Sequence, residues 1–172
     1  MEETISSTTL HKGKHFAFKT DHVRLNSSKE TVRDMVDHPG SVAILPIHNG
    51  EMVLIKQYRY PARSILIEIP AGTLETGEDP FACAVRELRE ETGYVAKDWS
   101  RLLSVYVSPG YSNEVIHIYV AEGLTHMGSD NEEDENIFVE KHSFEKVLEM
   151  IETNEIKDAK TVTGVYAYLT AI

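Results

Sequence analysis

Residues 72–94 read GTLETGEDPFACAVRELREETGY, and this stretch decides how the rest of the chain is interpreted. Its second half has the periodicity of an α-helix that begins near Pro80 and ends near Thr92. Asp79 is of a type favoured at the N-cap, Pro80 suits the first helical position, and Gly93 suits the position just past the end. The sequence therefore predicts a helix over residues 80–92.

This predicted helix carries acidic side chains beside its apolar stripe. At about 100° per residue, the stripe consists of Phe81, Ala84, Val85 and Leu88. Glu87 and Glu91 stack one turn apart next to the stripe, and Glu90 lies on its flank. Such like charges repel each other, whereas a hard cation such as Mg²⁺ is bound by carboxylate oxygens. The alternative is a solvated acidic face on which Arg86 pairs with Glu90.

The composition is that of a globular protein with a strong acidic excess. The chain has 172 residues, which favours one domain, and 41% of them are hydrophobic. Lys and Arg number 17 against 28 Asp and Glu, so the net charge is 17 − 28 = −11. This charge repels phosphate backbones and anionic lipid, so we expect no nucleic-acid partner and no membrane partner. A phosphate-bearing ligand would need a cation between itself and the protein.

Cysteine content and the first residues indicate a cytoplasmic protein. Cys83 is the one cysteine of the chain, so no disulfide can form within it. Acidic residues follow Met1 where a signal peptide requires basic ones. The apolar stretch of residues 42–47 is far too short to span a bilayer.

Strands and helices alternate in a way that predicts an α/β or α+β domain with a mixed sheet. Residues 1–14 are expected to be loosely ordered, and residues 15–40 to form N-terminal strands. Asn49 and Gly50 join two β-branched runs and predict a hairpin. The remaining predicted strands are 41–47, 52–58, 65–69, 102–107 and 115–120. Two further helices are predicted over 143–151 and 160–170, although Gly164 lies inside the second.

The residues of the acidic helix also follow a known pattern. Gly72, Glu78 and the run from Arg86 to Tyr94 resemble the Nudix box of the Nudix hydrolases in every charged and glycine position. Tyr94 is the one departure, because the family pattern favours a bulky aliphatic residue there. The resemblance implies a single domain over residues 1–172. It also implies an α/β/α sandwich around a mixed β-sheet, with an N-terminal antiparallel strand region.

The resemblance implies a metal site on the same helix. In the family pattern, Glu87, Glu90 and Glu91 would hold divalent metal together with the backbone carbonyl of Ala71. Mg²⁺ is the expected cofactor, and Mn²⁺ is a possible substitute. Arg86 would orient the acids, so Arg86 and Glu91 are counted with the catalytic residues.

Segments outside the box indicate the substrate class. Pro109 lies sixteen residues past Gly93, which resembles the ADP-ribose pyrophosphatase branch of the family. Residues 38–40, 57–60 and 67–72 resemble the same branch, which shares these motifs with other nucleoside diphosphate sugar hydrolases. The resemblance covers about residues 35–170. It implies hydrolysis of the pyrophosphate of ADP-ribose or a similar nucleotide sugar, giving a nucleoside monophosphate and a sugar phosphate.

Four residues are candidates for contact with the substrate, and two of them, Arg59 and Glu68, have a plainer alternative. Arg59 would bind the diphosphate, or else be a surface arginine at a strand end. Glu68 interrupts an apolar run and would serve a substrate hydroxyl or the metal, or else face outward from an edge strand. Glu114 would reach the sugar or the metal, and Pro109 marks the substrate side by the resemblance.

The general base is expected in the acidic loop of residues 129–136. In the branch that the sequence resembles, a loop at this point supplies a glutamate to the active site. Glu133 and Glu135 are the candidates, one to deprotonate water and the other to complete a metal shell, with Glu132 as a third. The alternative is a solvated charge run.

The resemblance also implies a homodimer in which the N-terminal strands help to form the nucleotide site of the partner. Two other functions remain open. One is a house-cleaning Nudix hydrolase of (d)NTPs or dinucleoside polyphosphates. The other is a noncatalytic sensor that binds ADP-ribose, although such domains commonly lose acids of the box and this chain has all of them.

Overall fold

The helix expected over residues 80–92 is present as α1 (Pro80–Thr92) in the computed structural model, which describes residues 1–128 and 137–171. The Asp79 carboxylate caps it by accepting hydrogen bonds from the backbone N–H groups of Phe81 and Ala82, at 3.0 and 3.1 Å. Gly93 ends it in the left-handed region, with φ of 72°. Both ends are therefore determined by local sequence, as predicted.

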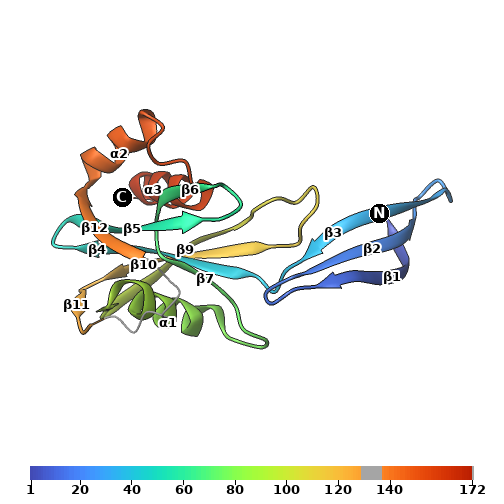
Figure 1. The fold of residues 1–172 in the computed structure, drawn as a ribbon, viewed down its shortest axis with the longest axis horizontal. Helices are drawn as coiled ribbons and strands as arrows, with labels where there is room; N and C mark the ends of the chain where they lie inside the picture. The colour runs from blue at the N-terminus through green and yellow to red at the C-terminus, as the bar shows by residue number, and fades with distance from the viewer. Residues whose placement is uncertain (129–136, 172) are drawn as a thin grey trace. The chain divides into compact units, whose positions relative to one another are not determined.

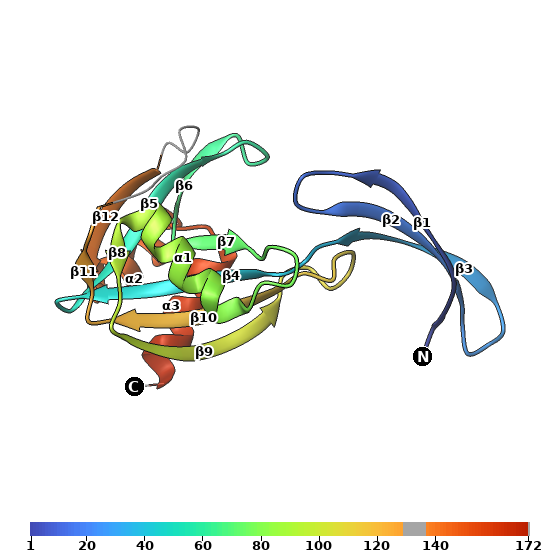
Figure 2. The same cartoon turned by 90° about the horizontal axis from the view of Figure 1, so that it is seen from below.

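A sheet with the strand order β12-β5-β4-β10-β9 receives this helix on one face. Among the described residues it has seven strands, because β6 pairs with β5 and β7 pairs with β4. β4 and β10 point the same way in Figure 2, whereas β4 and β5 are antiparallel, so the sheet is mixed as expected. Its strands are β4 (Ser41–His48), β5 (Glu51–Arg59), β6 (Ser64–Glu68), β7 (Ala71–Thr73), β9 (Asp98–Tyr106), β10 (Val115–Glu122) and β12 (Ile137–Ser143). A small separate ladder joins β8 (Tyr94–Val95) to β11 (Thr125–His126).

Helices cover both faces of the sheet. α1 lies on one side, and α2 (Phe144–Glu152) and α3 (Ala159–Ala171) lie on the other (Figures 1 and 2). Leu88 of α1 is fully buried in a cluster with Val42 and Val53 of the sheet. On the other side, a Cβ added to Gly164 of α3 would lie 3.3 Å from Ile69. The glycine inside α3 is thus explained by close packing. Among the described residues, no helix combines the length and hydrophobicity needed to cross a membrane.

The predicted hairpin between β4 and β5 is confirmed. Ile47 pairs with Met52, and His48 pairs with Glu51 across the turn. Asn49 and Gly50 both have positive φ, 53° and 82°. These values are the ones that a two-residue turn between twisted antiparallel strands requires.

The chain divides into two units, and most of this sheet lies with its helices in the second unit, residues 41–104 and 117–172. The first unit contains residues 1–40 and 105–116. It holds an antiparallel sheet of β1 (Glu3–Lys12), β2 (Ala17–Arg24) and β3 (Glu30–Asp37). The expected single domain over residues 1–172 stays a prediction.

Residues 1–14 differ from the expectation of loose order. β1 pairs with β2 from Glu3 opposite Arg24 to Lys12 opposite Ala17, although every residue of β1 is exposed. Arg33 of β3 also donates two hydrogen bonds to Glu2, at 3.0 and 2.7 Å. The strand is held by its ladder and by ion pairs, so hydrophobic alternation does not reveal it.

Removal of the α1 cap should weaken the second unit measurably. We expect Asp79→Ala to lower the free energy of unfolding by about 1 kcal/mol, because two N–H groups lose their acceptor. Urea denaturation followed by circular dichroism measures this change. Asp79→Ser, which keeps an acceptor, should retain most of the stability. Equal losses in both variants would contradict the capping role.

Candidate active site

β7 and α1 lie close together in the candidate site. A Cβ placed on Gly72 would lie 1.9 Å from both Cδ and Oε1 of Glu87. Any side chain at position 72 would therefore displace that carboxylate. Glycine is required here by the space that Glu87 occupies, which brings the Glu87 carboxylate against the backbone of β7.

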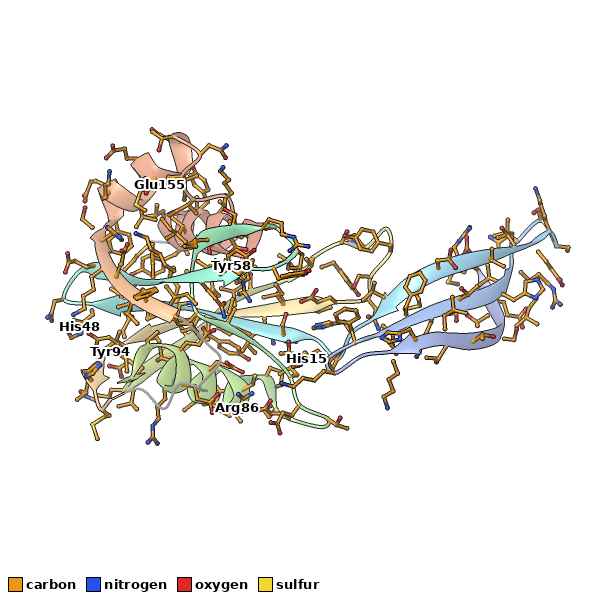
Figure 3. The ribbon with its side chains drawn as sticks, in the orientation of Figure 1. His15, His48, Tyr58, Arg86, Tyr94 and Glu155 are labelled. Atoms are coloured by element: carbon orange, nitrogen blue, oxygen red, sulfur yellow. The ribbon has the colours of Figure 1, made fainter. Side chains whose placement is uncertain are left out.

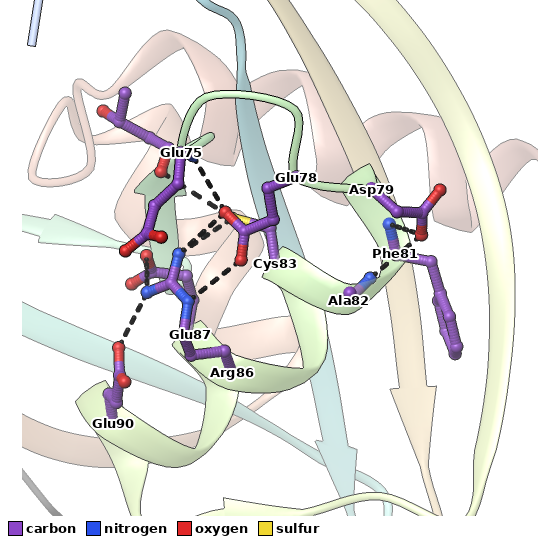
Figure 4. A network of polar contacts seen from close by, with 10 residues as sticks. Glu75, Glu78, Asp79, Phe81, Ala82, Cys83, Arg86, Glu87 and Glu90 are labelled. Atoms are coloured by element: carbon purple, nitrogen blue, oxygen red, sulfur yellow. Dashed lines mark hydrogen bonds and ion pairs between the residues drawn. The ribbon is translucent and has the colours of Figure 1, made fainter.

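Arg86 lies at the centre of a network of carboxylates around the first half of α1 (Figure 4). Its Nε and Nη2 donate to the two oxygens of Glu78, both at 3.1 Å. Its Nη1 donates to Glu87 at 2.6 Å and to Glu90 at 2.9 Å. One guanidinium thus forms ion pairs with three carboxylates. The hydrogen bonds with Arg86 lower the pKa of Glu78 and raise the pKa of Arg86 itself.

Glu91 lies one turn further along α1 and faces inward. It is only 4% exposed, and its Oε2 accepts a hydrogen bond of 2.8 Å from the backbone N–H of Ala71. Ala71 and Gly72 are adjacent, so β7 contacts α1 through both Glu87 and Glu91. The backbone of residues 71–72 and the acids of α1 therefore form one assembly.

This assembly fits a hard divalent cation by its donor chemistry. Glu87, Glu90 and Glu91 supply carboxylate oxygens along one helix, and Gly72 leaves room for them beside the backbone. In residues 1–128 and 137–171, however, no three acidic, histidine or cysteine side chains converge closely enough to bind one ion as they lie. Glu87 and Glu90 are instead paired with Arg86. Binding of a cation would require these carboxylates to exchange Arg86 for the metal.

A second charged cluster joins the β5–β6 hairpin to the start of α3. Arg59 donates two parallel hydrogen bonds to Glu68, from Nε at 2.9 Å and from Nη2 at 2.7 Å. Lys160, at the start of α3, donates to the same Oε2 of Glu68. Burial raises the pKa of Glu68, but the hydrogen bonds of Arg59 and the charge of Lys160 outweigh it, so the pKa is below its ordinary value. Glu68 is 1% exposed and therefore does not face outward from an edge strand.

The remaining expected site residues are placed as follows. Pro109 is exposed in the turn between β9 and β10, within the first unit. Glu114 belongs to the same unit, where its Oε1 lies 3.9 Å from Nδ1 of His38. Glu132, Glu133 and Glu135 lie outside the described residues. The structure thus brings together Ala71, Arg86, Glu87, Glu90 and Glu91, and separately Arg59 and Glu68.

Comparison with known proteins agrees with this geometry. The NUDIX domain model matches residues 37–164, which is most of the chain and includes α1 and the strands around it. The chain belongs to the Nudix family. Enzymes of this family generally depend on a divalent metal, which is consistent with the carboxylates of α1.

Relatives of this Nudix chain match it over nearly its full length. The ADP-ribose pyrophosphatase of Bacillus subtilis is 39% identical over 167 residues, covering 95% of this chain and 90% of the relative. The methanol dehydrogenase activator of Bacillus methanolicus is 40% identical, with the same coverage of both chains. A crystal structure of an ADP compounds hydrolase superposes with a TM-score of 0.86 at 20% identity, covering 98% of this chain and 92% of the other. This superposition confirms the predicted Nudix fold.

Tyr94, the one departure from the Nudix box pattern, is explained by its packing. It is 6% exposed and belongs to the core cluster beneath α1. Its ring lies 5.3 Å from that of His48 and 5.0 Å from that of His126, between centroids. Figure 3 shows Tyr94 next to His48. The tyrosine thus fills a core position, as an aliphatic residue would.

Sequence reasoning missed Lys160 and Asp158 as members of the second charged cluster. Lys160 is 92 residues from Glu68 in the chain, and Asp158 lies 3.1 Å from Nζ of Lys160. No local pattern could have identified them. The apolar run around Glu68 was the one available signal, because a buried carboxylate requires a cation.

Substitution of Gly72 tests the close approach of β7 to α1. We expect Gly72→Ala to lower the free energy of unfolding by about 1–3 kcal/mol, because the new methyl group would displace the Glu87 carboxylate. Gly110→Ala is the matched control, since a Cβ there meets nothing within 4 Å. Chemical denaturation of both variants measures the difference, and equal stability would contradict the contact.

The pKa of Glu68 leads to a prediction about acid stability. A carboxyl whose folded pKa is lowered stabilises the protein above its ordinary pKa of about 4.5, and this contribution is lost as the pH falls through the folded pKa. We expect Glu68→Gln to lower the free energy of unfolding by about 3–5 kcal/mol at pH 7. The gap from wild type should shrink in urea titrations as the pH is lowered below 4.5. A gap that is constant with pH would contradict the assignment.

Proposed function

We propose that this protein hydrolyses the pyrophosphate bond of ADP-ribose or a related nucleoside diphosphate sugar in the presence of Mg²⁺. The products would be a nucleoside monophosphate and a sugar phosphate. The observation that carries the proposal is the set of carboxylates that α1 places beside Gly72. These residues belong to a Nudix box in which every charged and glycine position is present. The relative from Bacillus subtilis, an ADP-ribose pyrophosphatase with 90% of its length matched, supports the substrate class.

The acids of α1 are proposed to hold the metal. Glu87, Glu90 and Glu91 would bind Mg²⁺ together with the carbonyl oxygen of Ala71, and Mn²⁺ would be a substitute. When bound, the cation neutralises charge on the diphosphate and lowers the pKa of coordinated water. Arg86 would orient the carboxylates before metal binds, and its contacts with Glu87 and Glu90 support this role.

Arg59 is proposed to bind the diphosphate. Its guanidinium can bond two phosphate oxygens, and its side chain is 37% exposed although it is anchored to Glu68. Both oxygens of Glu68 already accept hydrogen bonds from cations. We therefore propose that Glu68 orients Arg59 and does not bind a substrate hydroxyl. Pro109 and Glu114 stay proposed contacts of the substrate, with Glu114 at the sugar or the metal.

A glutamate of the acidic loop is proposed as the general base. Glu133 or Glu135 would take the proton from the water that attacks phosphorus, and Glu132 is a third candidate. The attack would cleave the bond between phosphorus and the bridging oxygen, and the leaving phosphate would carry that oxygen away. We also propose a homodimer built through the N-terminal strands and a cytoplasmic location.

Loss of one carboxylate should remove activity without unfolding the protein. We expect Glu91→Gln to lower kcat by about 10²–10⁴-fold, because one oxygen keeps its contact with Ala71 while the charge for the metal is lost. Glu155→Gln is the matched control, since Glu155 is exposed near the end of α2, away from Arg86 (Figure 3). Steady-state kinetics with Mg²⁺ and circular dichroism measure both effects. Full activity of folded Glu91→Gln would contradict the metal assignment.

A substrate panel decides between the proposed function and its alternatives. Purified protein is incubated with ADP-ribose, GDP-mannose, diadenosine polyphosphates and dNTPs, with Mg²⁺ or Mn²⁺, and products are separated by chromatography. The proposal expects cleavage of the nucleotide sugars to nucleoside monophosphates with the highest kcat/KM. Preference for dNTPs or dinucleotides would favour a house-cleaning hydrolase. Tight binding of ADP-ribose without turnover would favour a sensor.

A further inference from the structure

Glu68 is a buried carboxylate that is shared by two cations from distant parts of the chain. Arg59 reaches it from β5, and Lys160 reaches it from α3. With Asp158, which contacts Lys160 at 3.1 Å, the cluster holds two acids and two cations. Its formal charge is therefore balanced, and removal of one cation leaves an excess negative charge in a buried place.

The cluster has a buried end and an accessible end. The side chain of Lys160 is 11% exposed and that of Glu68 is 1% exposed, whereas that of Arg59 is 37% exposed. Lys160 thus binds the carboxylate from the interior, and Arg59 extends from it toward solvent. The pKa of Arg59 is raised chiefly by its hydrogen bonds to Glu68. The charge of Glu91 raises it further, so Arg59 is within electrostatic reach of this acid of α1.

The first turn of α3 fixes Lys160 in place. Asp158 accepts hydrogen bonds from the backbone N–H of Thr161 at 2.9 Å and from its hydroxyl at 2.6 Å. The same hydroxyl accepts a hydrogen bond of 2.9 Å from the backbone N–H of Ile69. Ile69 directly follows Glu68 and is fully buried. The start of α3 is therefore tied to the backbone that carries Glu68.

We propose that Lys160 is a positioning residue, which holds the Glu68 carboxylate so that the Arg59 guanidinium is presented to the diphosphate. The inference rests on the proposed function for the identity of the ligand, whereas the contacts of Lys160 and Arg59 with Glu68 are independent of that function. Arg59 donates to Glu68 through Nε and Nη2, so the direction of its free Nη1 is set by where the Glu68 carboxylate lies. Lys160 donates to Oε2 of Glu68, the oxygen that Nη2 of Arg59 also contacts, so it helps to fix where that carboxylate lies.

Kinetics of Lys160 variants test the proposal. We expect Lys160→Met to raise KM for ADP-ribose about tenfold with kcat changed less than about threefold, because binding of the diphosphate is weakened in substrate and transition state alike. Lys160→Arg, which can still pair with Glu68, should restore KM to within about threefold of wild type. Lys157→Met removes the same charge from an exposed neighbour and should leave both constants unchanged. Equal KM in Lys160→Met and wild type would overturn the proposal.

A double-mutant cycle separates positioning from simple stabilisation of α3. If Lys160 acts through Arg59, Lys160→Met should change KM less than about twofold in the Arg59→Ala background. A full tenfold effect in that background would overturn the proposal.

A measurement without substrate keeps this inference distinct from the proposed function. In ¹⁵N NMR of the free protein, the Arg59 Nε–Hε group should exchange slowly with water in wild type and Lys160→Arg, and rapidly in Lys160→Met. Slow exchange in Lys160→Met would overturn the positioning role, whatever the substrate. Failure of wild type to cleave any nucleotide of the panel would refute the proposed function alone, and the NMR result would still decide the role of Lys160.

Discussion

The close approach of α1 to the backbone at Gly72 is the constraint on which the second unit depends. Glu87 occupies the space that a Cβ at position 72 would fill, and Glu91 accepts a hydrogen bond from Ala71. α1 can lie this close because Leu88 and Ala84 are fully buried against the sheet. The same packing that forms the core therefore presses carboxylates against a strand backbone, at the cost of repulsion among them.

One cationic centre offsets that repulsion around α1, and a second one neutralises a buried carboxylate elsewhere in the same unit. Arg86 pairs with Glu78, Glu87 and Glu90 around α1, and Arg59 and Lys160 enclose Glu68. Four of the 28 acidic residues behind the net charge of −11 are therefore paired with cations at these two centres. In the proposed function, the diphosphate of the substrate would meet Arg59 at one centre and a metal ion at the other. An acidic protein can therefore bind a phosphate substrate, because an arginine and a metal ion would supply positive charge where the phosphates bind.

Local features could be predicted from sequence, and features that depend on distant residues could not. The bounds of α1 follow from Asp79, Pro80 and Gly93, because capping involves neighbours in the chain. β1 was missed since its side chains are exposed and only its ladder with β2 holds it. Arg59 and Glu68 were each recognised as candidates from the sequence. Their pairing with each other and with Lys160 could not be predicted, because the three residues belong to β5, β6 and α3.

The acids of α1 are proposed to bind the metal that the substrate requires. Anomalous diffraction from crystals grown with Mn²⁺ and a nonhydrolysable analogue of ADP-ribose tests this proposal most directly. We expect anomalous density beside Glu87, Glu90 and Glu91, with Arg86 released from at least one of its carboxylates and Arg59 at the diphosphate. Analogue bound with no anomalous density at α1, or with Mn²⁺ held by other residues, would contradict it.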